Sequence, residues 1–403
     1  MPVSSDRTVD LNGIQSALRE AQLDGWLFYD HHHRDPIAYR VLKIAPVMCT
    51  RRWYYLIPAH GEPAKLVHRI EGANLDGLPG AQHLYSSWVE QRQKLKQILD
   101  GKKRVTMEYS PLNDIPYVGL VDAGTVELVR SFGIDVISSA DLVQLFEARW
   151  SPEALASHLK AGQGVHAAVR GAFKMIRQIV AAGKETDEYA VQQEILRALN
   201  QYGLITDEPP IVAVNANTGN PHYSPGPGSS FPIRRNDFVL LDVWAKLSTP
   251  GAVYFDITWT GYVGKAVPRR CSEIFGVVRE SRDAAIELVK QSMQAGRTLR
   301  GCDVDDAARE VIKSHGYADY FVHRTGHSIG EDIHGNGANM DNFETRDTRT
   351  IIPGTCFSVE PGIYLDDFGV RSEVNVYVDE RDARVTGESQ QSVIPILNEG
   401  SLG

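Results

Sequence analysis

The first part of the chain alternates between amphipathic and fully apolar segments, a pattern that predicts helices interleaved with strands. Apolar residues spaced three and four apart favour helices, whereas short β-branched and aromatic runs favour strands. The helices are expected at residues 11–23, 87–99 and 116–132, and the strands at residues 25–29, 52–57, 64–70 and 104–109. The sequence His-Gly-Glu-Pro at residues 60–63 is expected to join two of these strands in a hairpin. These elements predict a small α/β domain over residues 1–150.

A second domain is predicted to start at Ser151, where an N-cap serine is followed by proline and an acid. Two helices and a set of strands follow, and the same order then recurs. The helices are expected at residues 151–182, 186–203, 272–295 and 304–315, and the strands at residues 211–214, 238–244, 253–262, around Phe321, 356–359 and 370–378. The recurrence predicts an α+β domain over residues 151–403, with two halves related by a pseudo-two-fold axis and a site between them.

Charge and cysteine content narrow the class of protein. The 403-residue chain has a net charge of −9 and no Lys/Arg run, which argues against nucleic acid or an anionic membrane as main partner. No apolar run approaches the length of a membrane span, and the amino end lacks the layout of a secretion signal. The four cysteines are widely separated, as expected for reduced thiols. We therefore expect a soluble, cytoplasmic protein.

Four carboxylates stand on or directly after segments that should be buried strands. They are Asp242, Asp256, Glu360 and Glu373. Any one of them alone is best explained as an acid at a strand end, solvated or paired with a surface cation. Four together need another explanation, because burying an ionised carboxylate costs several kcal/mol, and two such charges a few ångström apart repel by about 4 kcal/mol at an effective dielectric near 20. Arg371 is the only cation nearby in sequence, so the predicted counter-charge is divalent metal.

Three histidines cluster close behind the apolar residues 320–322, which predict a strand or another buried approach to an interior site. They are His323, His327 and His334, and no cysteine lies near them, which excludes thiolate-rich structural zinc sites. Four carboxylates and one imidazole suit two divalent ions that share bridging oxygens, and a ligand set without thiolate favours Mn, Co, Zn or Fe. A pair of such ions is a known device for hydrolysis.

Two other loops also contain histidines. His222 lies in a Gly/Asn/Pro-rich loop at residues 215–223, and its neighbours make it a candidate for the substrate pocket. The triplet at residues 31–33 is interpreted as a polar loop beside Pro36, because consecutive side chains point in different directions.

Six short motifs support a family resemblance. They are P-H-Y at 221–223, L-L-D at 240–242, F-D-I-T at 255–258, H-x-x-x-H-x-x-G at 323–330, V-E-P-G-I-Y at 359–364 and G-V-R-S-E at 369–373. Together they resemble the pita-bread metallopeptidases, specifically the prolidase (Xaa-Pro dipeptidase) and aminopeptidase P branch. The resemblance covers roughly residues 151–390, and the α/β domain before it looks like the amino-terminal domain of that branch. It implies a pita-bread fold for the second domain.

The resemblance also implies a metal centre. Two divalent ions, Mn, Zn or Co, would be bound by Asp242, Asp256, His327, Glu360 and Glu373. Asp256 and Glu373 would bridge them, Asp242 would hold one ion, and His327 and Glu360 would hold the other. A hydroxide bridging the ions would attack the carbonyl of the residue before proline.

Further residues receive roles from the same resemblance. His334 would hydrogen-bond the substrate and the developing oxyanion, and His222 would contact the scissile region or the proline side. His323, with Arg371 and Tyr364, would orient the substrate or its carboxylate. Glu360 would also carry the proton from the nucleophile to the leaving nitrogen.

The predicted function is therefore metal-dependent hydrolysis of the Xaa-Pro bond in dipeptides. One alternative is an aminopeptidase P, which releases the amino-terminal residue of longer Xaa-Pro peptides. The other is a pita-bread protein that binds a partner without catalysis, which is disfavoured because all five ligand positions are filled. Trp244, Trp259 and Val374 depart from the family pattern, and the two tryptophans are expected to reshape the walls of the site.

The resemblance implies a homodimer as well. Family members often pack the amino-terminal domain of one subunit over the cleft of the other, which would bring residues 31–36 near that site.

Overall fold

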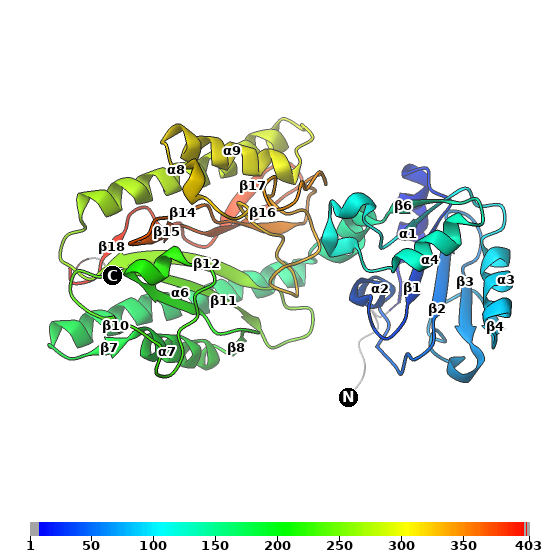
Figure 1. Cartoon of the computed structure of the whole chain (residues 1–403), viewed down its shortest axis with the longest axis horizontal. Helices are drawn as coiled ribbons and strands as arrows, with labels where there is room; N and C mark the ends of the chain where they lie inside the picture. The colour runs from blue at the N-terminus through cyan, green and yellow to red at the C-terminus, as the bar shows by residue number, and fades with distance from the viewer. Residues whose placement is uncertain (1–7, 399, 401–403) are drawn as a thin grey trace. The chain divides into compact units, whose positions relative to one another are not determined.

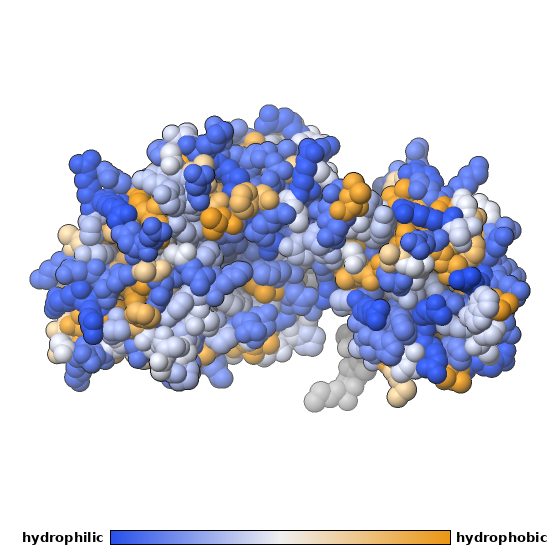
Figure 2. Space-filling model, in the orientation of Figure 1, coloured by the Kyte–Doolittle hydropathy of each residue, from blue (hydrophilic) through white to orange (hydrophobic). Residues whose placement is uncertain are grey.

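The computed structural model describes residues 8–398 and residue 400, and the chain divides into two compact units, Met1–Glu147 and Ala148–Gly403. Figure 1 shows the elements of both units. No helix within the described residues combines the length and the apolar character that crossing a membrane requires. The face drawn in Figure 2 is mainly hydrophilic, and its hydrophobic residues occur in small separate groups.

The first unit is built on a six-stranded sheet with the order β4-β3-β2-β1-β5-β6. The strands are β1 (Gly25–Asp30), β2 (Trp53–Pro58), β3 (Ala64–His68), β4 (Ala81–Tyr85), β5 (Arg104–Met107) and β6 (Asp135–Ser138). Strand β2 is antiparallel to both neighbours, whereas the other five run in one direction. The carboxyl ends of those five strands therefore lie at the same end of the sheet.

The helices of the first unit are α1 (Leu11–Glu20), α2 (Pro36–Leu42), α3 (Trp88–Ile98), α4 (Ala123–Arg130) and α5 (Ala140–Val143). Side chains alternate along β1, so that Trp26 and Phe28 pack into one apolar cluster and Leu27 and Tyr29 into another. Apolar residues thus cover both faces of the sheet.

The expected helix at residues 116–132 is wrong in its first half. Residues Pro116–Val118 form only a short 3-10 turn, and α4 begins later because Asp122 caps it by accepting a hydrogen bond from the Thr125 N–H at 2.9 Å.

The second unit repeats one order of elements. The first half holds α6 (Pro152–Ala181), α7 (Glu188–Gln201), β8 (Leu204–Ile205), β9 (Ile211–Val214), β11 (Phe238–Leu247) and β12 (Phe255–Tyr262). The second half holds α8 (Arg269–Gln294), α9 (Gly301–Ser314), β13 (Cys356–Val359), β14 (Gly362–Tyr364), β15 (Gly369–Arg371), β16 (Val374–Val378) and β17 (Ala383–Thr386). Short strands β7 (Thr186–Asp187), β10 (Pro232–Ile233) and β18 (Ile394–Pro395) complete the unit. Helices α6 and α7 lie on one side of the strands and α8 and α9 on the other (Figure 1).

Two strand predictions in this unit need correction. Residues 320–322 do not form a strand: a 3-10 turn, Ala318–Tyr320, leads into an irregular segment in which Phe321 is buried under the Arg309 guanidinium, 4.2 Å from the ring centroid. The apolar character there reflects burial rather than sheet pairing. The expected strand at 370–378 is interrupted at Ser372 and Glu373, between β15 and β16.

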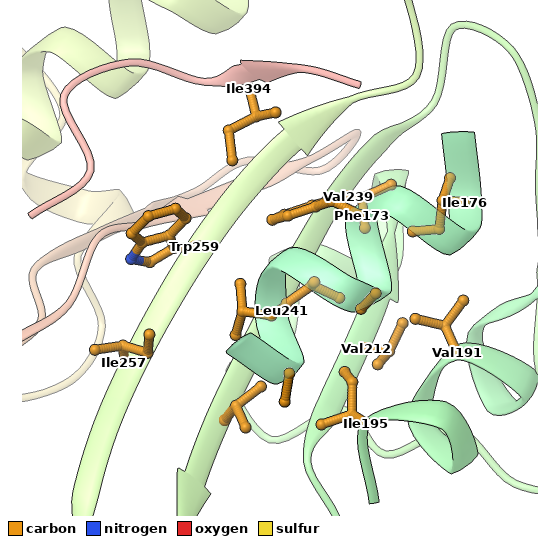
Figure 3. Packing of buried hydrophobic residues seen from close by; sticks show 14 of the residues in the cluster. Phe173, Ile176, Val191, Ile195, Val212, Val239, Leu241, Ile257, Trp259 and Ile394 are labelled. Carbon is orange, nitrogen blue, oxygen red and sulfur yellow. The ribbon is translucent and has the colours of Figure 1, made fainter. Parts of the chain in front are cut away.

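The largest apolar cluster fixes which way β11 and β12 face. Phe173 and Ile176 of α6 and Val191 and Ile195 of α7 pack against the strands (Figure 3). The strand residues in this cluster are Val239, Leu241, Val243, Phe255, Ile257 and Trp259. Since side chains alternate in a strand, the residues between them, including Asp242, Asp256 and Thr258, point to the opposite face.

Candidate metal centre

Strands β11 and β12 bring two of the predicted acids onto one buried face. Asp242 pairs in register with Thr258, and Asp256 pairs with Trp244 on the same antiparallel ladder. Asp242 and Asp256 are 8% and 5% exposed. The apolar packing of the other face against α6 therefore holds both carboxylates away from bulk water.

Thr258 links the acids of the two halves, a role that the sequence reasoning did not assign. Its Oγ1 lies 3.0 Å from Asp242 Oδ1 and 2.8 Å from Glu373 Oε2, so the hydroxyl donates to one of these carboxylates at a time. It also accepts a hydrogen bond from Arg371 Nε at 2.9 Å. Thr258 stands two residues after Asp256, and the strand period of two was the signal that places both on one face.

The second half contributes Glu360 and Glu373 from the same end of an antiparallel pair. Val359 of β13 pairs with Val374 of β16, so Glu360, directly after β13, and Glu373, directly before β16, both follow from this register. Asn375 of β16 joins the halves, because its side chain accepts from the Asp256 N–H at 3.2 Å and donates to the Asp256 carbonyl at 2.7 Å.

His327 approaches these acids on an irregular segment that runs beside β13. Ser358 fixes it: the Ser358 hydroxyl accepts from the His327 N–H at 2.9 Å and donates to Glu360 Oε1 at 3.1 Å. A side chain at Gly326 would place its Cβ 1.9 Å from the Ser358 carbonyl oxygen, so only glycine permits this approach. The His327 Nδ1 lies 3.1 Å from the Ser328 carbonyl, which assigns the proton to Nδ1 and leaves the Nε2 lone pair facing the acids.

Three of the predicted ligands form a compact group. One ligand atom each from Asp256, His327 and Glu373 lies within 4.8 Å of the other two. The His327 Nε2 is 3.6 Å from Asp256 Oδ2 and 3.5 Å from Glu360 Oε1. Asp242 joins the group through the Thr258 hydroxyl.

The electrostatics of the group suit a cation. Burial, followed by repulsion from neighbouring carboxylates, raises the pKa values of Asp256 and Glu373 well above normal, and burial also raises the pKa of Glu360. Burial lowers the pKa of His327. Among the described residues, Asp256 Oδ1 and Glu373 Oε1 are buried and receive no hydrogen bond. Oxygens without donors beside an unprotonated imidazole nitrogen are the donor set that a divalent metal ion satisfies.

Arg371 is the cation inside the cluster. Its guanidinium donates to Asp242, and its Nε is 3.9 Å from Glu360 Oε2. The carboxylates, Asp242 first, raise its pKa against the opposing effect of burial, so it stays charged. One guanidinium does not neutralise four carboxylates.

Arg371 also begins a chain of polar contacts that includes the predicted residues Tyr364 and His323. The His323 Nδ1 lies 2.7 Å from the Arg324 carbonyl, and its Nε2 lies 2.6 Å from the Tyr364 hydroxyl. Burial, followed by the positive charge of Arg371, lowers the pKa of His323 to about 3, so the imidazole is neutral. The Tyr364 hydroxyl thus donates to His323 and accepts from Arg371 Nη1 at 3.4 Å.

The predicted residues His334 and His222 are both exposed. The His334 ring packs edge-on against His327 with centroids 4.4 Å apart. His327, together with burial, lowers the pKa of His334 to about 3. Of the predicted histidines, His327 lies beside the acids and His334 packs against it. His323 reaches Arg371 through Tyr364, and His222 is close enough to His334 for the two imidazoles to interact electrostatically.

The two tryptophans that depart from the family pattern lie on opposite faces. Trp244 shares the face of Asp242, packs with Ile211, Ala213, Leu240 and Tyr223, and donates to Asp207 Oδ1 at 2.9 Å. Trp259 instead joins the α6 core (Figure 3). The expectation that both tryptophans reshape the site is therefore wrong for Trp259. Neighbouring side chains of a strand point to opposite faces, so Trp259, which directly follows Thr258, points away from the site.

We expect Asp256→Asn to stabilise the chelator-treated protein. Neutralising a buried carboxylate whose pKa is raised removes desolvation and repulsion, so the free energy of unfolding at pH 7 in EDTA should rise by on the order of 1 kcal/mol. Urea unfolding of both proteins measures the change. The exposed Asp319→Asn is the control and should leave stability within about 0.5 kcal/mol. A destabilised Asp256→Asn protein would contradict this account of the cluster.

Comparisons with known proteins agree with this geometry. Residues 156–380 match the sequence model of Metallopeptidase family M24. The chain is 30% identical over 223 residues to the Xaa-Pro dipeptidase of Pyrococcus furiosus, a match covering 53% of this chain and 57% of that protein. It is 31% identical over 245 residues to the Xaa-Pro dipeptidase of Lactobacillus helveticus, covering 60% of each. The chain thus spans somewhat more than half the length of these curated relatives.

Solved structures share the fold over almost the whole chain. The dipeptidase PepE of Mycobacterium ulcerans superposes with a TM-score of 0.68 at 22% identity, covering 95% of this chain and 96% of that one. The prolidase of Thermococcus sibiricus superposes with a TM-score of 0.62 at 20% identity, covering 97% and 99%. This likeness confirms the α+β fold expected for the chain. Because the family model matches more than half of its 403 residues, the chain belongs to metallopeptidase family M24.

Proposed function

We propose that the chain is a metal-dependent dipeptidase that hydrolyses the Xaa-Pro bond. The observation that carries this proposal is the buried group of Asp256, His327 and Glu373, whose ligand atoms lie within 4.8 Å of one another. It occurs in a member of a metallopeptidase family, and the curated relatives described above are named Xaa-Pro dipeptidases.

The metal would be held by residues from both halves of the second unit. We propose two divalent ions, Mn, Zn or Co, bound by Asp242, Asp256, His327, Glu360 and Glu373. When bound, they would activate a water molecule and polarise the scissile carbonyl. Thr258 and Ser358 would orient the ligands through the hydrogen bonds described above, as partners behind metal ligands commonly do.

Residues around the ligands would handle the substrate. The imidazoles of His334 and His222, both exposed, would donate N–H groups to the substrate carbonyl region. Tyr364 and His323 would hold Arg371 in place to orient the substrate. Cleavage leaves proline with a secondary amine, and Glu360, whose pKa burial raises, would carry a proton to that nitrogen.

The test is hydrolysis of Xaa-Pro dipeptides by the full chain with added Mn, Zn or Co. We expect activity with a stoichiometric divalent metal, loss of activity with chelator, and recovery on adding metal back. Glu373→Gln should lower kcat at least about a hundredfold, because it removes a charged ligand of the centre. The exposed Glu380→Gln is the matched control and should behave like the unmodified chain.

Each alternative function predicts a different result. A higher kcat/KM on an Xaa-Pro-Xaa-Xaa peptide than on the dipeptide would favour an aminopeptidase P. Absence of both bound metal and peptidase activity would favour a binding protein and overturn the proposal.

We further propose that Trp244 selects the residue before proline. Trp244 pairs across the ladder with Asp256, and Asp207 anchors its indole. It thus forms an apolar wall beside the proposed metal site. Trp244→Ala should raise kcat/KM for Phe-Pro relative to Ala-Pro by about tenfold, the usual magnitude for reshaping an apolar pocket. The exposed Tyr202→Ala is the control, and an unchanged ratio for Trp244→Ala would exclude this role.

Assembly and location are proposals as well. We propose a homodimer, supported by the family resemblance, and light scattering should give twice the monomer mass; a monomer mass would contradict it.

We propose a cytoplasmic location, which the four buried free cysteines support. Fractionation of cells that make the chain tests the location.

A further inference from the structure

The first unit contains a cavity of about 770 Å³, and none of the proposed metal ligands lies in its lining. Its lining comes from the carboxyl ends of β1, β3 and β4 and from the amino ends of β2, α3 and α4. Ligands of open α/β sheets bind outside the carboxyl ends of the strands. The cavity therefore lies where such a sheet offers a binding site.

The lining of this cavity is strongly basic. Its basic residues are His31, Arg34, Arg51, Arg52, His68 and Arg92. Among the described lining residues the single carboxylate is Asp122, which already accepts hydrogen bonds from the Thr125 N–H at 2.9 Å and from the Thr125 hydroxyl at 2.8 Å. Glu71, beside the lining, accepts from the backbone N–H groups of Thr50 and Arg51, each at 3.0 Å.

The four arginines form no close ion pair with a carboxylate among the described residues. Within residues 8–398, none of their guanidinium groups lies within 4.0 Å of a carboxylate oxygen, although ion pairs occur elsewhere in the chain. The Arg51 Nη1 donates to the carbonyl and the hydroxyl of Thr50, and the Arg92 guanidinium lies 5.3 Å from the centroid of the Trp88 ring. Like charges around one cavity repel each other unless an anion lies between them. The planar fork of arginine matches phosphate and carboxylate oxygens.

An exposed aromatic ring stands at the rim of the cavity. Trp88, the first residue of α3, is 65% exposed, although tryptophan is one of the most costly side chains to leave in water. Tyr29 and Tyr85 line the same cavity and are buried. A flat ring system would cover Trp88 while an anionic group reaches the arginines.

We propose that this cavity binds a small organic phosphate of nucleotide size, with its phosphate on the arginines and its planar ring against Trp88. A volume of about 770 Å³ suits a ligand of that size, since small-molecule sites span roughly 300–1,000 Å³. The excess of positive charge selects a multiply charged anion. The inference does not depend on the proposed peptidase function.

The test is calorimetric titration of the full chain with AMP, pyrophosphate and citrate at low salt. We expect AMP and pyrophosphate to bind, with affinity that falls as salt screens the charges. The variant combining Arg34→Gln and Arg92→Gln should weaken both at least about tenfold. Both arginines are exposed, so the variant should fold, and its thermal unfolding verifies this. Trp88→Ala should weaken AMP but not pyrophosphate.

Arg104→Gln is the matched control. Arg104 is exposed at the amino end of β5, which is the end of the sheet opposite the cavity, and it lies outside the cavity lining. It should leave binding unchanged. Absence of AMP and pyrophosphate binding at about 1 mM ligand would overturn the proposal. Equal loss of affinity in Arg104→Gln, or citrate binding as tightly as AMP, would also overturn it, because either result indicates attraction without a built phosphate site.

Discussion

The second unit is organised around the burial of several like charges at one place. Four carboxylates lie together with one guanidinium, and two of their buried oxygens receive no hydrogen bond within the described part of the chain. A hydrophobic core alone gives no reason for this arrangement, because each buried charge weakens the folded state. A bound cation supplies the reason, since it converts mutual repulsion into shared attraction.

The fold meets this constraint because the strands carry apolar side chains on one face and acidic side chains on the other. Helices α6 and α7 pack against the apolar face of the sheet that contains β11 and β12 (Figure 3). The acids lie on the opposite face. The second half supplies the remaining groups through the register of β13 with β16. Thr258 and Asn375 then tie the halves together at the acids themselves. The groups are thus positioned by rigid strands, and His327 is the member that arrives on an irregular segment.

Each unit gathers charged side chains of one sign at one site, and the sign differs between the two units. The acids of the second unit gather where the halves meet, whereas the first unit gathers arginines at the carboxyl edge of its sheet. A net charge of −9 hides this division, because it sums over both units. The overall charge of a chain therefore says little about the ligands of its individual sites.

The sequence by itself determined the elements with strong periodicity and the acids they carry. Helices α6, α7, α8 and α9 and strands β11, β12 and β13 follow from apolar spacing, and Asp242, Asp256, Glu360 and Glu373 follow from their positions on or beside such strands. Where local pattern was ambiguous, tertiary structure decided: Phe321 is buried without a sheet partner, and Trp259 faces the helices rather than the site. The link through Thr258, the approach of His327 beside Gly326 and the arginine-lined cavity depend on contacts between residues far apart in the chain. The periodicity of the sequence indicates to which face of a helix or strand a side chain points. Only the packed fold determines which side chains from distant parts of the chain lie against that face.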